Sequence, residues 1–233
     1  MLLPSPQVAL AAGLLGLAVG STFAAAAAWL RARGARVAYT RKVFHFGVFS
    51  GAAAAHTLWG LPGTNAYGTV AALLVLGAVA RGEGNPVYEA LARDADRPRR
   101  SLFIVVPLVT TALGGLVSAL LAGPYATVGY LVAGWGDAVG EPVGGRWGKH
   151  SYRVPSLGGV PAIRTLEGSA GVFTASWVAA AVGLWSLGAG PSGIGVALAC
   201  ALVGTAVEAV SHHGTDNLTI QVAVSLTAAW LSG

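Results

Sequence analysis

The sequence predicts an all-α integral membrane protein, a polytopic bundle of about eight (seven to nine) transmembrane helices. Of its 233 residues, 55% are hydrophobic and only 10% are charged, and the mean hydropathy is +0.66. Soluble domains carry about 25% charged residues, so this composition lies outside their range. The apolar residues also gather in runs of membrane-crossing length, which fixes the class before any motif is considered.

Eight apolar runs are each about long enough to cross a hydrocarbon core of roughly 30 Å. In chain order they cover residues 8–30, 43–61, 64–80, 102–122, 125–145, 168–188, 192–210 and 217–232. The first run is expected to be an anchor and not a secretory signal, because its arginines follow the apolar core. The third is short and the fifth contains two acids, so seven spans plus one re-entrant or broken segment is a second interpretation.

Charge placement gives an independent test of this topology. All 14 Lys and Arg residues lie in three loops, at 31–42, 81–100 and 146–164. Cationic loops stay on the cytoplasmic side, and with eight spans these three loops share that side. We therefore expect both termini on the opposite face. The chain is interpreted as a single polytopic membrane domain, 1–233, whose catalytic face is formed by cytoplasmic loops 31–42, 81–101, 146–167 and 211–217.

The charge and cysteine content exclude several classes of function. A net charge of +5 is explained by a basic cytoplasmic face on anionic lipid, and no nucleic-acid motif is present, so no nucleic-acid partner is expected. The single cysteine, Cys200, lies in an apolar run and excludes an intrachain disulfide and a cysteine metal cluster. Abundant Gly, Ala, Ser and Thr in the spans predict close helix packing.

The candidate chemistry starts with Asp137 and Glu141, which interrupt the fifth apolar run. On a helix this spacing places both carboxylates on one face, where lipid makes uncompensated charge costly. A divalent cation such as Mg²⁺, which also brings phosphates with it, is the simplest compensator. The alternative is a structural salt bridge, with Arg146 as its nearest cation. Pro142 removes a backbone donor and is expected to open the helix at this point.

A basic, glycine-rich loop follows the acid pair. It contains Gly144, Gly145, Gly148, Gly158 and Gly159 beside Arg146, Lys149, Arg153 and Arg164. Glycines let backbone N–H groups approach an anion, and Arg and Lys form charge-assisted bonds to phosphate oxygens. The next helix is expected to begin within 164–169, so its free N–H groups offer another phosphate site. Alternatively, this loop has no binding function and is only a positively charged connection between two spans.

Three further stretches lie on the same face. Arg41 and Lys42 are either topology determinants or phosphate contacts, and His45 is either packed or a general base. Glu208 precedes a polar stretch at 211–219, in which Asp216 and Asn217 would cap the last helix. The acids of 81–100 are expected in a solvated interfacial loop, with a surface helix that turns Val87, Tyr88 and Leu91 toward lipid.

Three sequence blocks occur in order: RKVFH at 41–45, GDAVGEPVGGRWGK at 136–149 followed by RTLEGSAGVF at 164–173, and Glu208 with TDNLT at 215–219. Together they resemble the CTP-dependent lipid-alcohol (polyprenol) kinases. This family comprises dolichol kinase, phytol and farnesol kinases and the CTP-using diacylglycerol kinase, and it is related to phosphatidate cytidylyltransferases. The resemblance spans residues 41–219, whereas no P-loop or protein-kinase signature is present.

The resemblance implies transfer of the γ-phosphate of CTP to the hydroxyl of a lipid alcohol, with Mg²⁺ or another divalent cation, giving CDP and a lipid monophosphate. The expected catalytic residues are His45, Asp137, Glu167 and Asp216. The expected metal ligands are Asp137, Glu141 and Glu208, and Glu167 is the alternative to Glu141 as the acid that assists Asp137. The expected nucleotide- and phosphate-binding residues are Arg41, Lys42, Gly144, Arg146, Gly148, Lys149, Arg164, Thr165, Gly168 and Asn217.

The lipid substrate stays open at this point. Glu141 resembles an acid of phytol and farnesol kinases, whereas 164–169 is similar to a block of dolichol and diacylglycerol kinases. A cytidylyltransferase that forms a CDP-lipid is the nearest alternative function, and a transporter is a remote one, disfavoured because the polar residues crowd one face. The expected partners are CTP, the lipid alcohol and membrane lipids, and both a monomer and a homo-oligomer remain open.

Overall fold

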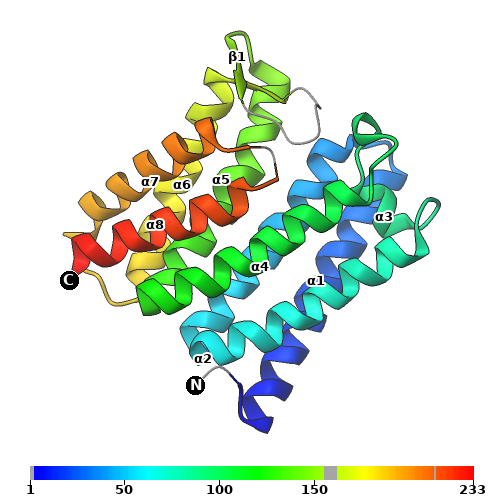
Figure 1. Ribbon diagram of the computed structural model, residues 1–233. Helices are drawn as coiled ribbons and strands as arrows, with labels where there is room; N and C mark the ends of the chain where they lie inside the picture. Colours follow the sequence, from blue (N-terminus) through cyan, green and yellow to red (C-terminus); the bar gives the residue numbers. More distant parts are fainter. Residues whose placement is uncertain (1–2, 155–161, 213) are drawn as a thin grey trace. The chain divides into compact units, whose positions relative to one another are not determined.

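The computed structural model describes residues 3–154, 162–212 and 214–233. Contacts divide the chain into two compact units, Met1–Val109 (unit 1) and Thr110–Gly233 (unit 2). The described residues form seven helices of 17 or more residues: α1 Pro6–Ala32, α2 Val37–Arg81, α4 Leu102–Ala122, α5 Ala126–Trp147, α6 Leu166–Ser186, α7 Gly193–Val210 and α8 Asp216–Ser232 (Figure 1). A short helix, α3 (Pro86–Leu91), and a ribbon of two strands, β1 (Ser151–Val154) and β2 (Ala162–Thr165), complete these elements. The predicted all-α class is confirmed, although the ribbon was not predicted.

Helix α2 is a hairpin in unit 1 and not one straight rod. The Tyr67 hydroxyl donates a 2.9 Å hydrogen bond to the carbonyl of Val48, 19 residues earlier. On a straight helix these residues would be roughly 28 Å apart, so the helix must fold back between them. The reversal occurs at Gly60, whose backbone (φ 62°, ψ −157°) is non-helical and favours glycine.

A second hairpin joins α4 to α5 within unit 2. The Tyr130 hydroxyl donates a 2.8 Å hydrogen bond to the carbonyl of Gly115, 15 residues earlier. The turn between the helices is a single 3₁₀ turn, Gly123–Tyr125, in which Gly123 has φ +55°. Both hairpins therefore turn with almost no break in helical structure.

These tight turns change the number of spans. In the described part of the chain, five helical stretches are long and apolar enough to cross a membrane: Pro6–Ala32, Val37–Arg81, Leu102–Trp147, Leu166–Ser186 and Gly193–Val210. The prediction of eight separate spans is wrong in number, because the stretches of 45 and 46 residues each contain two of the predicted runs. With 17 residues, α8 covers roughly 26 Å, less than a hydrocarbon core. The five stretches indicate an integral membrane protein.

The short helix α3 is packed inside unit 1 and does not face lipid. Tyr88 and Leu91 are 3% and 6% exposed and pack in one cluster with Phe44 and Val75, against which Val87 also packs. The predicted lipid-facing surface helix is therefore wrong. Asn85 caps α3 by accepting hydrogen bonds from two backbone N–H groups of its first turn, which fixes where this buried helix begins.

Ion pairs hold the segment around α3 in place. Arg100 is 3% exposed and donates to Glu89 at 2.7 Å and to Glu83 at 3.1 Å. This hydrogen bonding holds the pKa of Glu89 below its ordinary value. Asp96 is also buried, with Arg93 at 2.9 Å, so the expectation of a solvated loop is wrong for Asp96, whereas the Glu89 side chain is 29% exposed. These charges are structural, because each has its partner within the segment.

Unit 2 is a bundle in which α5 packs on α6 and α8, and α7 packs on α6 and α8. Glycines allow these helices to approach closely, as the sequence predicted. A Cβ added at Gly129 would lie 2.5 Å from the Gln221 carbonyl of α8, and one at Gly204 would lie 2.9 Å from Val132. Several of the closest contacts in unit 2 are therefore backbone contacts that a larger side chain would disrupt.

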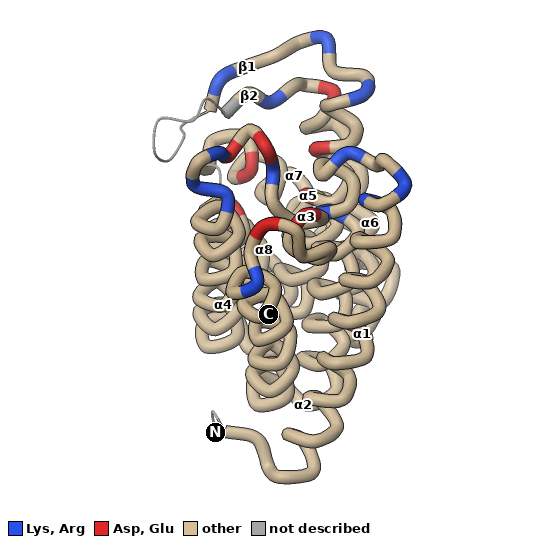
Figure 2. The backbone as a smooth tube through the Cα atoms, turned by 90° about the vertical axis from the view of Figure 1, so that its right-hand side faces the viewer, with Lys and Arg blue, Asp and Glu red and all other residues tan. Residues whose placement is uncertain are grey.

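In each unit the charged residues gather toward one end of its helices (Figure 2). In unit 2 this end comprises the C-terminal part of α5, the ribbon, and the adjoining ends of α6, α7 and α8. Trp147 is exposed at the charged end, and Trp185 and Trp230 are exposed at the far ends of α6 and α8. Tryptophan at both ends of apolar helices is typical of the two membrane interfaces.

Candidate active site

Asp137 and Glu141 lie one helical turn apart on α5, and both side chains are half-buried. Each follows a glycine that packs on α6: a Cβ at Gly136 would lie 2.6 Å from the Ser176 hydroxyl, and one at Gly140 would overlap a valine. Because successive residues turn about 100° around a helix, the two acids lie beside the α6 contact and not within it. The helical spacing thus places them on one flank, as expected.

Helix α5 continues through Pro142 to Trp147. The expectation that the proline opens the helix is therefore wrong. Proline removes only its own backbone donor, and a helix that is packed along its length tolerates that loss. The acid pair consequently sits on regular helix.

Gly144, Gly148 and Gly168 are packing residues in this structure. A Cβ at Gly144 would lie 2.8 Å from the Thr165 Oγ1 atom, and one at Gly168 would lie 3.2 Å from the Cα of Gly144. The close approach of α5 to the start of α6 therefore explains these glycines without a ligand. Their role in nucleotide binding stays a prediction, and Gly158 and Gly159 lie outside the described residues.

Two backbone N–H groups at the start of helix α6, those of Leu166 and Gly168, are engaged within the chain. Thr165 is the N-cap, and its side chain accepts a 3.1 Å hydrogen bond from the Gly168 N–H. The Leu166 N–H donates to the carbonyl of His150 at 2.9 Å. The predicted phosphate site at this helix start would have to share or displace these bonds.

The Glu167 carboxylate closes the loop between α5 and β1. One of its oxygens accepts from the backbone N–H groups of Lys149 and His150, at 3.0 and 3.3 Å. Its other oxygen lies 2.7 Å from the His150 Nδ1 atom. Glu167 therefore holds the loop that presents Lys149, and in this structure its contacts are those of a loop anchor.

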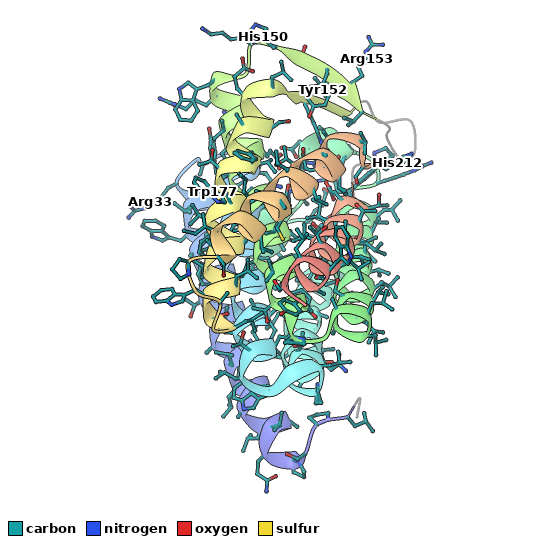
Figure 3. All side chains as sticks on the ribbon, turned by 90° about the vertical axis from the view of Figure 1, so that its left-hand side faces the viewer. Arg33, His150, Tyr152, Arg153, Trp177 and His212 are labelled. Atoms are coloured by element: carbon teal, nitrogen blue, oxygen red, sulfur yellow. The ribbon has the colours of Figure 1, made fainter. Side chains whose placement is uncertain are left out.

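The ribbon has two chemically different faces. Its register pairs Tyr152 with Arg164 and Arg153 with Ile163, and paired residues of an antiparallel ribbon share a face. Tyr152 and Arg164 face the helices, and the Tyr152 hydroxyl lies 2.7 Å from that of Ser169 on α6. Arg153 projects away from the helices (Figure 3).

Arg164 joins the ribbon to α7 and α8. Its Nε lies 3.0 Å from Glu208 at the end of α7, and its Nη2 lies 3.2 Å from Asp216 at the start of α8. The three side chains are only 14%, 11% and 13% exposed. Its Nη1 is buried, and within the described residues it has no hydrogen-bond partner. The sequence predicted all three residues as functional, and the structure brings them into one ion cluster.

Asn217 is oriented toward α4. Its Nδ2 donates a 2.8 Å hydrogen bond to the Thr111 Oγ1 atom, and the side chain is 5% exposed. Its backbone N–H donates to the Asp216 carboxylate at 3.0 Å. The Asn217 side chain is therefore engaged inside the bundle, while its backbone contacts Asp216.

Sequence comparison adds a relative to this geometry. The chain is 28% identical over 191 residues to a phytol kinase of Synechocystis sp., an alignment that covers 81% of this chain and 77% of that protein. The chain is a distant homologue of phytol kinase. This finding confirms the resemblance drawn from the motifs. No protein-family model matches the chain, and no solved structure matches it at significant similarity.

Three of the predicted site residues lie in unit 1, and the homology to phytol kinase does not assign them a role. Arg41, Lys42 and His45 lie in the first turns of α2; Lys42 is buried, and the His45 ring lies 4.3 Å from that of Phe49. Their participation in a site with unit 2 stays a prediction. Sequence reasoning overlooked His150, Tyr152 and Thr111, which gain their contacts only from residues distant in the chain.

No group of three or more His, Cys, Asp or Glu side chains that could hold a metal ion is found among residues 3–154, 162–212 and 214–233. A preformed metal cage is therefore absent from that part of the chain. Mg²⁺ commonly binds through one or two carboxylates together with substrate phosphates. The half-buried pair of Asp137 and Glu141 fits that mode. Glu208 pairs with Arg164 at 3.0 Å.

Proposed function

We propose that this protein is a membrane-embedded kinase that transfers the γ-phosphate of CTP to the hydroxyl of an isoprenoid alcohol, with phytol as the first candidate. The distant homology to a phytol kinase over 81% of the chain carries this proposal. The ordered motifs support the use of CTP, because they are those of the CTP-dependent lipid-alcohol kinases. The products are CDP and a lipid monophosphate.

The nucleotide would bind at the charged end of unit 2. Arg146 and Lys149 are exposed there, and Glu167 fixes the loop that carries Lys149. The buried Nη1 of Arg164 offers a further N–H group for a phosphate oxygen. Charge spreads over the transferred phosphoryl group, so positioned cations are the main requirement of this chemistry.

Asp137 and Glu141 would hold the Mg²⁺ that accompanies the nucleotide. When bound, the ion neutralises phosphate charge and orients the transferred group. The protein's own acids then contribute two carboxylates on one flank of α5, half-buried and therefore partly shielded from competing water. Asp216 would position or deprotonate the lipid hydroxyl, which enters laterally between helices.

The charged ends would lie at the cytoplasmic side, where soluble CTP is available. The concentration of all Lys and Arg in three loops supports this orientation. Both termini would then lie on the opposite side. The exposed tryptophans at either end of the unit 2 helices support a bundle that spans both interfaces.

One assay tests the function. Purified protein is incubated with CTP, ATP, GTP or UTP and with phytol, farnesol, geranylgeraniol, a polyprenol or diacylglycerol. Detection of CDP and a lipid monophosphate as products would support the kinase. Detection of pyrophosphate and a CDP-lipid would refute it and show a cytidylyltransferase instead. Asp137→Asn should abolish turnover, and Asp94→Asn is the matched control, because Asp94 is an exposed acid of unit 1. Equal activity of wild type and Asp137→Asn would remove Asp137 from the site.

A further inference from the structure

A polar contact joins α4 to the first turns of α8. The Thr111 Oγ1 accepts a 2.8 Å hydrogen bond from the Asn217 Nδ2, and the Thr111 carbonyl accepts one of 3.3 Å from Gln221. Gln221 also donates to the Asn217 carbonyl at 2.6 Å. Asn217 and Gln221 are 5% and 1% exposed, so these bonds form where unsatisfied polar atoms would be costly.

The two helix backbones approach closely at this contact. A Cβ added at Gly114 would lie 2.7 Å from the Cα of Leu218. One turn earlier, the Thr110 hydroxyl donates a 2.8 Å hydrogen bond to the Gly214 carbonyl, just before α8 begins. The start of α8 is therefore fixed against α4 on both sides of Asp216.

The contact continues to the ion cluster. The Asn217 N–H donates to one Asp216 oxygen at 3.0 Å, and the other Asp216 oxygen accepts from Arg164 at 3.2 Å. Thr111 orients the Asn217 side chain, and Asn217 is part of the turn that orients the Asp216 carboxylate. A single hydrogen-bonded network thus runs from α4 through α8 to the ribbon.

We propose that Thr111 is a positioning residue for Asp216, acting through Asn217, and that Asn217 supports α8 and does not contact the nucleotide. The proposal rests on the proposed kinase function, in which Asp216 acts at the lipid hydroxyl. It follows that the loss of the Thr111 hydroxyl affects turnover and leaves nucleotide affinity unchanged.

Thr111→Val keeps the size of the side chain and removes its acceptor. Turnover (kcat) should fall about tenfold, the scale expected when a buried amide donor loses its partner, with the KM for CTP unchanged. Thr111→Ser retains the hydroxyl and should restore turnover. Thr227→Val is the control, because Thr227 lies on α8, the helix of Asn217 and Gln221, and its hydroxyl donates within that helix, to the Ala223 carbonyl at 2.8 Å.

Three kinetic outcomes would overturn the proposal. Wild-type turnover in Thr111→Val would show that the contact does not position Asp216. A raised KM for CTP with unchanged kcat would show that Asn217 binds the nucleotide. Equal losses in the valine and serine variants would assign the effect to packing and overturn the role of the hydroxyl.

Hydrogen–deuterium exchange separates this proposal from the proposed function. Backbone amides of residues 216–221 should exchange faster in Thr111→Val than in wild type or Thr227→Val, whatever the protein's activity. If wild type phosphorylates no lipid alcohol, the proposed function fails, and the exchange data alone decide the structural claim. Equal exchange in all three proteins would then refute it.

Discussion

The ion cluster around Arg164 makes a quantitative prediction about stability. Arg164 donates at 3.0 Å to Glu208 and at 3.2 Å to Asp216, and all three side chains are more than four-fifths buried. Breaking such a buried pair from one side costs about 3–5 kcal/mol, because the remaining carboxylates lose their shared cation. Arg164→Gln should therefore lower the free energy of unfolding by about 3–5 kcal/mol.

For a chain of this length, each kcal/mol corresponds to a shift of about 2–4 °C in the unfolding temperature. Arg164→Gln should thus unfold at least about 6 °C below wild type in detergent, measured by scanning fluorimetry. Arg153→Gln is the matched control, because Arg153 lies on the outer face of the same ribbon and is exposed. Its unfolding temperature should remain that of wild type.

A double variant tests whether charge is the cause. Adding Glu208→Gln to Arg164→Gln removes one of the two carboxylates that the lost guanidinium had joined. The unfolding temperature should then recover in part, giving a non-zero coupling energy in the double-mutant cycle. An Arg164→Gln protein that unfolds with wild type would refute the reasoning, as would strictly additive losses.

Four further outcomes are expected. Asp137→Asn should lose CTP-dependent turnover and retain the wild-type unfolding temperature; residual activity near wild type contradicts its role. Lys149→Gln should raise the KM for CTP, with little effect on kcat, and an unchanged KM would remove it from the nucleotide site. The hydrogen bond from Arg100 lowers the pKa of Glu89 in the folded state. The ionised Glu89 carboxylate therefore stabilises the fold fully above the unfolded-state pKa of about 4.3, and this stabilisation is lost as the pH falls through the folded-state pKa. In Glu89→Gln the unfolding temperature should therefore fall less at acid pH than it does in wild type. The same fall in both proteins would contradict this role of Glu89. Gly140→Leu should destabilise by about 1–3 kcal/mol through overpacking against α6, and a neutral effect in scanning fluorimetry would show that this contact is loose.

Composition and apolar runs were sufficient to predict most helices and their ends. The predicted runs 168–188 and 192–210 became Leu166–Ser186 and Gly193–Val210, since caps and glycine turns bound them closely. The number of separate spans was not predictable in the same way. The breaks between apolar runs show where the chain turns. Whether helical hydrogen bonding is interrupted at those breaks depends on the backbone dihedral angles of Gly60 and Gly123.

The ribbon and the buried α3 depend on contacts that no local pattern contains. The strands have four residues each, too few for alternation to distinguish them from loop. Their orientation comes from Tyr152 and Arg164, whose partners lie on α6, α7 and α8. Likewise, Tyr88 and Leu91 on α3 look amphipathic in sequence, and only the packing of α1 and α2 shows that they face protein.

The same limitation explains why charge alone could not assign the cations of the 146–164 loop. By composition, Arg153 and Arg164 are equivalent, because both lie in a basic loop beside an acid pair. In the ribbon they face opposite sides. The register places Arg164 on the inner face, beside two acids, and Arg153 on the outer face, beside Ile163. Arg164 therefore contributes to folding through its Nε and Nη2 atoms, and the proposed phosphate contact would fall to its Nη1 atom. Lys149 stands apart from both, since its backbone is fixed by Glu167 while its side chain remains exposed. A cation on an anchored loop binds an anion with less loss of conformational freedom than one on a mobile loop. The proposed nucleotide contact is thus better assigned by how the backbone is held than by how many positive charges the loop contains.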